Sequence, residues 1–517
     1  MASPTKLLFI GLDSAEPALM SAWEESGDLP TIRALRQRGA WAAFESPRGF
    51  GNGVLWPTLF TGVNAGKHGR YFARQIRCGR YTAAAFGDAD YKRQPFWAAL
   101  SDAGLRSAVI DMVRAPLTEG INGLQVVDWM AHDPDSPVIR CQPSDLAREV
   151  VERFGSDPLE GEGDAVGRGL SEYRQLRDGL IRRIDQKTEM SCHYLERGDW
   201  DLFMTVFADP HDVGHQFWHL HDPTFPLYDA ELAAQLGDPI KQVYVALDQA
   251  VARLVAAAGD DAVVVLFAGP GIGPNYTANH LLDGALRRLE GDPRTSGDIA
   301  VDRLKAVYRK VVPAAIRNRA RTVADRTDEA LKEADRSRRK CFVIPHNDNA
   351  GAIRINLVGR EPSGLVRRGA EMDAYCRELT EDLLAMTDPE SGRPVVADVV
   401  RVAAEYDGAH LDALPDLLAI WNREGPIGGM RSAKIGEIRK TYPGNRTGDH
   451  TTRCLMIVDG ASTHRGELER EVSAVDIAPT LAAMLDVTLT DVDGAVIPEL
   501  LPRPPAAGTT GAGLAAG

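Results

Sequence analysis

The chain has 517 residues, of which 44% are hydrophobic, and a formal net charge of −14. This length fits one large α/β domain with insertions or two to three smaller domains. So acidic a balance argues against a protein that binds a nucleic-acid backbone, which needs clustered Lys and Arg. A small anionic substrate remains compatible with it, because bound cations can reverse the field locally.

The cysteines and the apolar runs indicate the compartment. The six cysteines lie far apart and include no C-x-x-C pair, which favours reduced thiols over a disulfide framework or a zinc knuckle. The apolar run that begins at Leu7 is too short for a signal peptide, and no run reaches the roughly 18 residues of a membrane span. We therefore expect a cytoplasmic protein with neither a membrane nor a nucleic acid as its partner.

In chain order, the first expected element is a buried parallel strand at Leu7–Leu12, which ends at Asp13. A helical pattern follows over Pro17–Gly39, and long helices are expected at Leu170–Arg197 and Pro239–Ala258. Strands that alternate with helices predict an α/β fold with a mostly parallel, doubly wound sheet and helices on both faces. Further strands are expected at Ser107–Asp111, Leu124–Asp128, Leu202–Phe207, Ala262–Ala268, Ala352–Leu357, Leu417–Trp421 and Cys454–Val458.

The domain organisation follows from composition. Residues 1–502 are expected to form a single α/β domain, interrupted at about 285–340 by an exposed helical insertion. The segment 303–340 is densely charged with a helical period and few apolar residues, so a partner-binding arm is the alternative interpretation. Residues 503–517 are Arg, Pro, Ala, Gly, Thr and Leu, and this composition predicts a disordered tail.

Acidic and histidine residues gather next to the expected strands. Ligands in doubly wound sheets bind beyond the carboxyl ends of the strands. Asp13 follows the first strand, Asp209, His211 and His215 follow Leu202–Phe207, and His450 precedes Cys454–Val458. On a helix, His211 and His215 would share one face, and this spacing favours Zn, Mn or Fe. The structural alternative is that both histidines cap a helix or form hydrogen bonds among aromatic residues near Trp218.

Other catalytic motifs are missing. The run Gly269-Pro-Gly-Ile-Gly273 follows a strand, but the third glycine of G-x-G-x-x-G would fall at Pro274. The sequence has neither a G-x-x-x-x-G-K-[ST] phosphate loop nor a G-x-S-x-G elbow. A dinucleotide oxidoreductase, a P-loop enzyme and a serine hydrolase are therefore disfavoured.

Six blocks, in order, carry a resemblance to a known family. They are Phe9-Ile-Gly-Leu-Asp-Ser-Ala-Glu-Pro17 with Leu29-Pro-Thr-Ile-Arg33; Trp56-Pro-Thr-Leu-Phe-Thr-Gly62 with Lys67-His-Gly69; His211–Trp218; Gly351–Glu361; Gly448-Asp-His450; and Val475-Asp-Ile-Ala-Pro-Thr480. Together they resemble the alkaline phosphatase superfamily, in its branch of type I phosphodiesterases and nucleotide pyrophosphatases. The resemblance implies a two-metal centre and carries the first-strand ligand onto Asp13 and two histidine ligands onto His215 and His450.

The chain departs from the pattern of this family at three positions. The nucleophile position falls on Asn52, which has no hydroxyl, and the position of an Asp-His metal-binding pair falls on Gly269-Pro270. The Asp of the D-x-x-x-H pair is replaced by His211. Asn52 is interpreted either as an oxyanion donor or as a turn residue in Gly51-Asn-Gly53.

The missing nucleophile and Asp-His pair would remove the ligands of one metal. The remaining acidic and histidine residues would suffice to bind the other metal. We expect one site for a divalent metal, zinc or else manganese, with Asp13, His211, His215 and His450 as ligands and with Asn52 and Asp209 as catalytic residues. The predicted function is metal-dependent hydrolysis of phosphodiester, pyrophosphate or related phosphate or sulfate esters in small anionic substrates, by metal-bound water. The alternatives are a catalytically degenerate binding protein and a phosphotransferase of the phosphoglycerate-mutase type.

Overall fold

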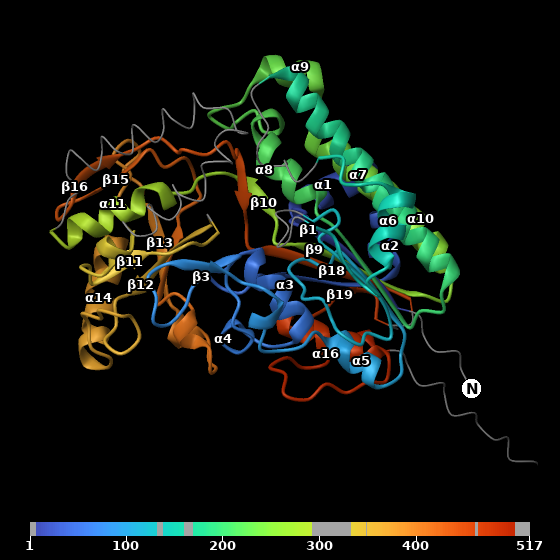
Figure 1. Cartoon of the computed structure of the whole chain (residues 1–517). Coiled ribbons are helices and arrows are strands. Elements are labelled where there is room, and N and C mark those ends of the chain that lie inside the picture. The colour runs from blue at the N-terminus through green and yellow to red at the C-terminus, as the bar shows by residue number, and fades with distance from the viewer. Residues whose placement is uncertain are drawn as a thin grey trace, which may run out of the picture.

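The computed structural model describes residues 7–131, 138–159, 169–291, 332–347, 349–460 and 464–501. The strands of the central sheet are β1 (Leu7–Asp13), β2 (Ala40–Glu45), β5 (Ser107–Ile110), β6 (Gly123–Val127), β7 (Arg140–Gln142), β8 (Leu202–Phe207), β9 (Val263–Gly269), β18 (Arg453–Asp459) and β19 (Gly466–Glu467). Their order is β19-β2-β18-β9-β1-β8-β5-β6-β7 (Figure 1). All of them except β18 and β7 run in the same direction.

The centre of the sheet is formed by β1, which pairs in parallel with β8 on one side and β9 on the other. All seven residues of β1 are buried. A parallel strand that is covered on both faces is apolar along its whole length, which explains the run Leu7-Leu-Phe-Ile. The mostly parallel sheet predicted from the sequence is confirmed.

Helices cover both faces of this sheet (Figure 1). On one face, residues such as Leu180, Phe217 and Val243 join a single core with the even-numbered residues of β1. On the other face, Trp56 and Trp97 pack with Phe9. The first face carries α1 (Pro17–Ser26), α2 (Pro30–Arg38), α6 (Leu146–Phe154), α7 (Leu170–Arg197), α8 (Asp209–His221) and α10 (Pro239–Ala258), and the second carries α3 (Asn52–Thr61), α5 (Phe96–Asp102) and α16 (Ile477–Met484).

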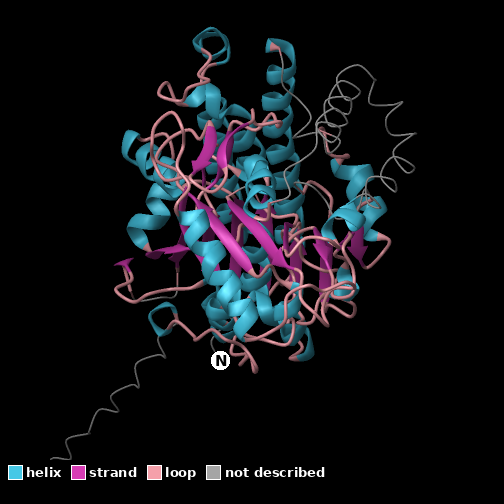
Figure 2. Cartoon of the chain, turned by 90° about the vertical axis from the view of Figure 1, so that its left-hand side faces the viewer, coloured by secondary structure: helices cyan, strands magenta, loops and turns pink. Residues whose placement is uncertain are grey.

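A second, antiparallel sheet stands beside the first, at the left of Figure 1 and facing the viewer in Figure 2. Its order is β11 (Cys341–Val343), β12 (Ala350–Ile355), β14 (Leu417–Trp421) and β13 (Val396–Arg401), and it packs on α11 (Asn279–Leu289) and α14 (Ala370–Leu384). The strands expected at Ala352–Leu357 and Leu417–Trp421 therefore exist, but they do not extend the doubly wound sheet. Apart from Arg354 both are apolar, and both are largely buried, so their composition resembles that of the central strands.

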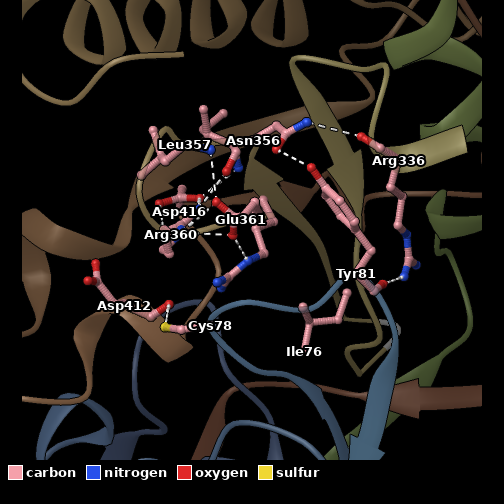
Figure 3. A network of polar contacts seen from close by, with 12 residues as sticks. Ile76, Cys78, Tyr81, Arg336, Asn356, Leu357, Arg360, Glu361, Asp412 and Asp416 are labelled. Atoms are coloured by element: carbon pink, nitrogen blue, oxygen red, sulfur yellow. Dashed lines mark hydrogen bonds and ion pairs between the residues drawn. The ribbon is translucent and has the colours of Figure 1, made fainter. Parts of the chain in front are cut away.

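A buried ionic network follows β12 and explains the conspicuous block Gly351–Glu361 (Figure 3). Glu361 accepts from Arg354 at 2.6 Å and from Arg360 at 2.9 Å, and Arg360 also pairs with Asp416 at 2.6 Å. Asn356 accepts from the Tyr81 hydroxyl at 2.9 Å. These contacts tie the second sheet to the segment after α3, so the polar residues of this block are structural.

Short elements complete the described fold. They are α4 (Ala65–His68), α9 (Ala230–Leu236), α15 (Val402–Glu405), β3 (Arg74–Ile76), β4 (Ala83–Ala85), β10 (Ile272–Pro274), β15 (Gly429–Ser432), β16 (Gly436–Arg439) and β17 (Gly448–His450). Most of the expected insertion at 285–340 and the tail at 503–517 lie outside the described residues, although 285–289 belong to helix α11, where Ala285 and Leu286 are buried. Within the described ranges, no helix is long and apolar enough to cross a membrane.

Candidate functional site

The site begins at the carboxyl end of β1, where Asp13 is fully buried. One carboxylate oxygen, Oδ1, accepts a hydrogen bond from the indole Nε1 of Trp56 at 2.8 Å. The other, Oδ2, lies 2.8 Å from Nδ1 of His211. Since a carboxylate only accepts, this contact places the proton of His211 on Nδ1 and the lone pair on Nε2.

His211 and His215 both come from α8, which starts two residues after β8 ends. Their spacing places the two rings one turn apart on one face, with ring centroids 4.7 Å from each other. Both side chains are buried. The i, i+4 relationship expected from the sequence is therefore present, and it is produced by the helix that follows the strand.

His450 arrives from a distant part of the chain, on the short strand β17. This strand pairs with β10, where Ile272 stands opposite His450. The His450 ring centroid lies 4.7 Å from that of His211 and 4.9 Å from that of His215. Three buried imidazoles from two segments thus meet at the edge of the central sheet.

The close approach of β17 to α8 depends on glycine. A Cβ at Gly448 would collide with the carbonyl oxygen of Gly214, on the inner face of α8. With no side chain there, the carbonyl oxygen of Gly448 accepts a hydrogen bond from Nδ1 of His215 at 2.7 Å. That bond fixes the tautomer of His215, with the proton on Nδ1 and the lone pair on Nε2.

The three histidines suit a divalent metal. One ring nitrogen from each of His211, His215 and His450 can be chosen so that all three lie within 4.8 Å of one another. Among the described residues, this is the only group of at least three His, Cys, Asp or Glu side chains that meets this criterion. Burial, helped by the nearby charge of Arg446, lowers the pKa of His215 well below its ordinary value, so its imidazole is neutral as a metal ligand must be.

Asn52, where the resemblance predicts the nucleophile position, faces the histidines. It is the first residue of α3 and is buried, and its Nδ2 lies 3.1 Å from Nδ1 of His211. The N-terminus of a ten-residue helix presents backbone N–H groups that favour an anion. The side-chain amide of Asn347 lies beside it, with Nδ2 3.4 Å from Oδ1 of Asn52.

Asp209 does not join the histidine cluster. It precedes His211 by two residues, which on a helix turns its side chain to the opposite face. There it lies 3.9 Å from Arg183 of α7, and neither of its oxygens has a hydrogen-bond partner among the described residues. Burial raises the pKa of Asp209 to about 7. Arg183 also pairs with Asp212 at 2.7 Å, so this group of charges anchors α8 to α7.

Gly269 and Pro270, where the resemblance predicts a metal-binding Asp-His pair, offer no side-chain ligand. Gly269 ends β9 directly opposite Asp13. Besides Asp13, the carboxylate of Glu16 lies in this region, since a Cβ at Gly271 would collide with it. Glu16 is already neutralised by Arg453, at 2.9 Å, and also accepts from the Thr451 hydroxyl at 2.9 Å.

Ser14 and Arg446 are site residues that the sequence prediction missed. Ser14 has φ of 63°, a left-handed conformation that costs a serine about 1 kcal/mol. Its Oγ lies 3.3 Å from Nδ1 of His211 and 3.4 Å from Nδ1 of His450. Arg446 brings Nη1 to 3.3 Å from Nε2 of His215. The place of Ser14 directly after Asp13 was the only available signal, whereas nothing marked Arg446.

Comparisons with known proteins identify the family and the fold. The family model of type I phosphodiesterase / nucleotide pyrophosphatase matches residues 7–425. No curated protein matches the chain.

Solved structures share the fold at low sequence identity. Phosphonoacetate hydrolase from Sinorhizobium meliloti, in complex with phosphonoformate, superposes with a TM-score of 0.50 and 15% identity, covering 92% of this chain and 94% of that one. Human ectonucleotide pyrophosphatase / phosphodiesterase 5 gives a TM-score of 0.50 and 12% identity, covering 95% and 97%. The murine protein of the same name gives 0.50 and 10%, covering 95% and 98%.

Proposed function

Because the chain belongs to the type I phosphodiesterase/nucleotide pyrophosphatase family, and so is a hydrolase of the alkaline phosphatase superfamily, we propose that it cleaves phosphodiester- or pyrophosphate-type esters of small anionic substrates with one divalent metal. The observation that carries this proposal is the convergence of His211, His215 and His450 in one buried cluster. Asp13 belongs to the same cluster through its contact with His211.

The donor set supports zinc first and manganese second. Neutral imidazoles are borderline-soft ligands, and three of them with an open position form a typical catalytic zinc shell. Asp13 and the Gly448 carbonyl hold the Nδ1 sides of His211 and His215, as carboxylates and carbonyls do behind metal-bound histidines. A zinc ion bound there would supply an activated water and polarise the ester oxygen.

Residues of the chain would handle the charge on the substrate. Asn52 and the first N–H groups of α3 would donate to a phosphoryl oxygen whose negative charge grows in the transition state. Arg446 would neutralise a second oxygen from the side of His215. Asn52 has no hydroxyl, so we infer direct hydrolysis without a phosphoenzyme at this position. Asp209 is proposed to hold α8 against α7 and to take no direct part in the reaction.

A binding protein without turnover is the second candidate. It is favoured by the lack of side-chain ligands at Gly269 and Pro270 and by the pairing of Glu16 with Arg453, which occupies the carboxylate closest to Gly271. The phosphotransferase alternative has less support, because phosphoryl transfer through the protein needs a nucleophile at the position that Asn52 occupies.

Metal content and turnover of paired variants test the proposal. The wild-type protein is expected to retain about one zinc or manganese per chain after dialysis and to hydrolyse chromogenic phosphodiesters in preference to phosphomonoesters or sulfate esters. His215→Ala should lose both the metal and the activity. The matched control is His221→Gln, six residues further along α8, where the ring pairs with Asp238 instead.

The outcomes separate the two candidates. Absence of metal and of turnover in the wild-type protein would favour the binding protein. Two metals per chain would show that other residues complete a second site. Retention of metal and activity in His215→Ala would reject the histidine centre.

A further inference from the structure

A cavity of about 510 Å³ opens next to the histidine cluster. Arg446 joins the two, because it lines the cavity and also brings Nη1 to 3.3 Å from Nε2 of His215. The next residue, Thr447, donates its backbone N–H to the carbonyl oxygen of His215 at 2.7 Å. A group held in this cavity would therefore be adjacent to the proposed metal ligands.

The walls of the cavity come from separate parts of the chain. The loop after α8 supplies Phe225, and the segment between β10 and α11 supplies Tyr276. The connection between β14 and β15 supplies Ile427, and the one between β16 and β17 supplies Lys440 and Tyr442. Loops from these separate segments thus enclose the cavity, and a volume of this size is typical of small-molecule sites.

Aromatic rings give the cavity flat, apolar surfaces. The rings of Phe225 and Tyr276 stack with centroids 6.0 Å apart and an interplanar angle of 25°. The rings of His280 and Tyr442 meet edge to face at 5.7 Å. Rings arranged in this way favour a planar group, which can pack against a face or an edge.

The charge of the cavity is positive in a chain whose net charge is −14. Its described lining residues include Arg439, Lys440 and Arg446 and no Asp or Glu. Arg439 is compensated, since it pairs with Glu390 and Glu437 at 2.6 Å each. Lys440 is exposed and forms no ion pair with the described residues, so its charge is available to a ligand.

We propose that this cavity binds the part of the substrate beyond the scissile phosphoryl group, and that it selects a planar aromatic group carrying its own carboxylate or phosphate. The aromatic plane would pack against Tyr276 and Tyr442, and the second anion would pair with Lys440. This inference rests on the proposed hydrolase function for the position of the phosphoryl group, which Arg446 would share with the histidine centre.

Direct binding of three uncleavable probes tests the cavity separately from turnover. The probes are methylphosphonate, phenylphosphonate and 4-carboxyphenylphosphonate, titrated calorimetrically into the full chain with zinc present. Affinity is expected to rise about tenfold from the methyl to the phenyl compound. A further rise of about fivefold is expected for the carboxylated compound, as an exposed charge pair supplies, and it should shrink at high salt.

Two variants and one control show which residues produce these gains in affinity. Lys440→Gln should remove the gain from the carboxylate and leave the gain from the ring. Tyr442→Leu should reduce the gain from the ring. The control is Lys434→Gln, on the turn between β15 and β16, where the lysine pairs with Asp382 at 2.7 Å and does not line the cavity. It should bind all three probes as the wild type does.

The results distinguish failure of the inference from failure of the proposed function. Equal affinity for the two aryl compounds, or a gain from the carboxylate that persists in Lys440→Gln, would overturn the inference even if the protein hydrolyses esters. If the gain in affinity depends on Lys440 but the protein hydrolyses no ester, the proposed ligand specificity of the cavity is supported and the proposed hydrolase function is rejected.

Discussion

The imidazole Nδ1 of His215 donates to the carbonyl oxygen of Gly448, two residues before His450. This hydrogen bond links the two segments that carry the candidate ligands, because His215 belongs to α8 and His450 to β17. Any change that separates these segments should therefore disturb the whole centre.

Gly448→Ala should weaken metal binding. The new methyl group would meet the carbonyl oxygen of Gly214, so β17 must move and the hydrogen bond to His215 must lengthen. We expect a loss of about 10- to 100-fold in zinc affinity, measured by competition with a chromophoric chelator. Gly284→Ala is the control, since its methyl group would lie 3.7 Å from Ile438 and leave the site unchanged. Equal zinc affinity in Gly448→Ala and the wild type would contradict the prediction.

Ser14→Gly should separate stability from metal binding. Glycine adopts the φ of 63° without strain, and this gain offsets the greater flexibility of glycine in the unfolded chain. The free energy of unfolding of the metal-free protein should therefore change by less than about 1 kcal/mol. Zinc affinity should nevertheless fall about tenfold, because His211 and His450 both lose the Ser14 hydroxyl. An unchanged affinity would mean that the hydroxyl does not orient these rings.

Asn52→Ala should impair turnover and leave the metal in place. The variant loses the amide that faces the centre, whereas the three histidines remain. Loss of one oxyanion donor typically lowers kcat about 100-fold or more. Steady-state kinetics with a chromogenic phosphodiester and metal analysis of the same sample provide the two measurements. A variant that loses its metal would instead assign Asn52 a role in shaping the cluster.

His68 should make stability depend on pH. Burial, assisted by the charge of Arg70, lowers the pKa of His68 from 6.5 to about 3. The ring accepts from the backbone N–H of Arg70 at 3.1 Å through Nδ1 and lies 3.2 Å from the Thr58 hydroxyl through Nε2. The folded state therefore keeps this ring neutral below pH 6.5, where the unfolded chain takes up a proton. The stability that the neutral ring provides is complete above about pH 6.5 and is lost as the pH falls toward 3.

The test is His68→Asn, whose Oδ1 can still accept from Arg70. Between pH 7 and pH 4.5, the wild type should lose roughly 2 to 3 kcal/mol more than the variant. Urea unfolding at the two pH values measures this difference. Parallel pH curves for the two proteins would show that the ring becomes protonated without unfolding.

Much of the fold was predictable, because the signals were long and local. The apolar run of β1 and the helical periods of α7 and α10 predicted elements that the structure confirms. The separate sheet containing β12 and β14 was not predictable. Burial on both faces makes such strands look the same whichever sheet they join, and the order of strands depends on contacts far apart in sequence.

The histidine cluster was partly predictable, and the reasons differ from residue to residue. His211 and His215 stand at a helical spacing that the sequence displays, whereas Asp209 is turned away by the same helix. Ser14 was missed because its left-handed backbone is invisible in the sequence. Arg446 was missed because it reaches His215 from a loop more than two hundred residues away.

The arrangement around Gly269 limits how this protein can change. At φ of 139°, an aspartate there would be strained and its Cβ would lie 2.7 Å from the sulfur of Cys454. The neighbouring carboxylate of Glu16 is held by Arg453. Placing an Asp at 269 would therefore also require a smaller residue at 454. A second metal site at this place would therefore need several coordinated substitutions rather than one.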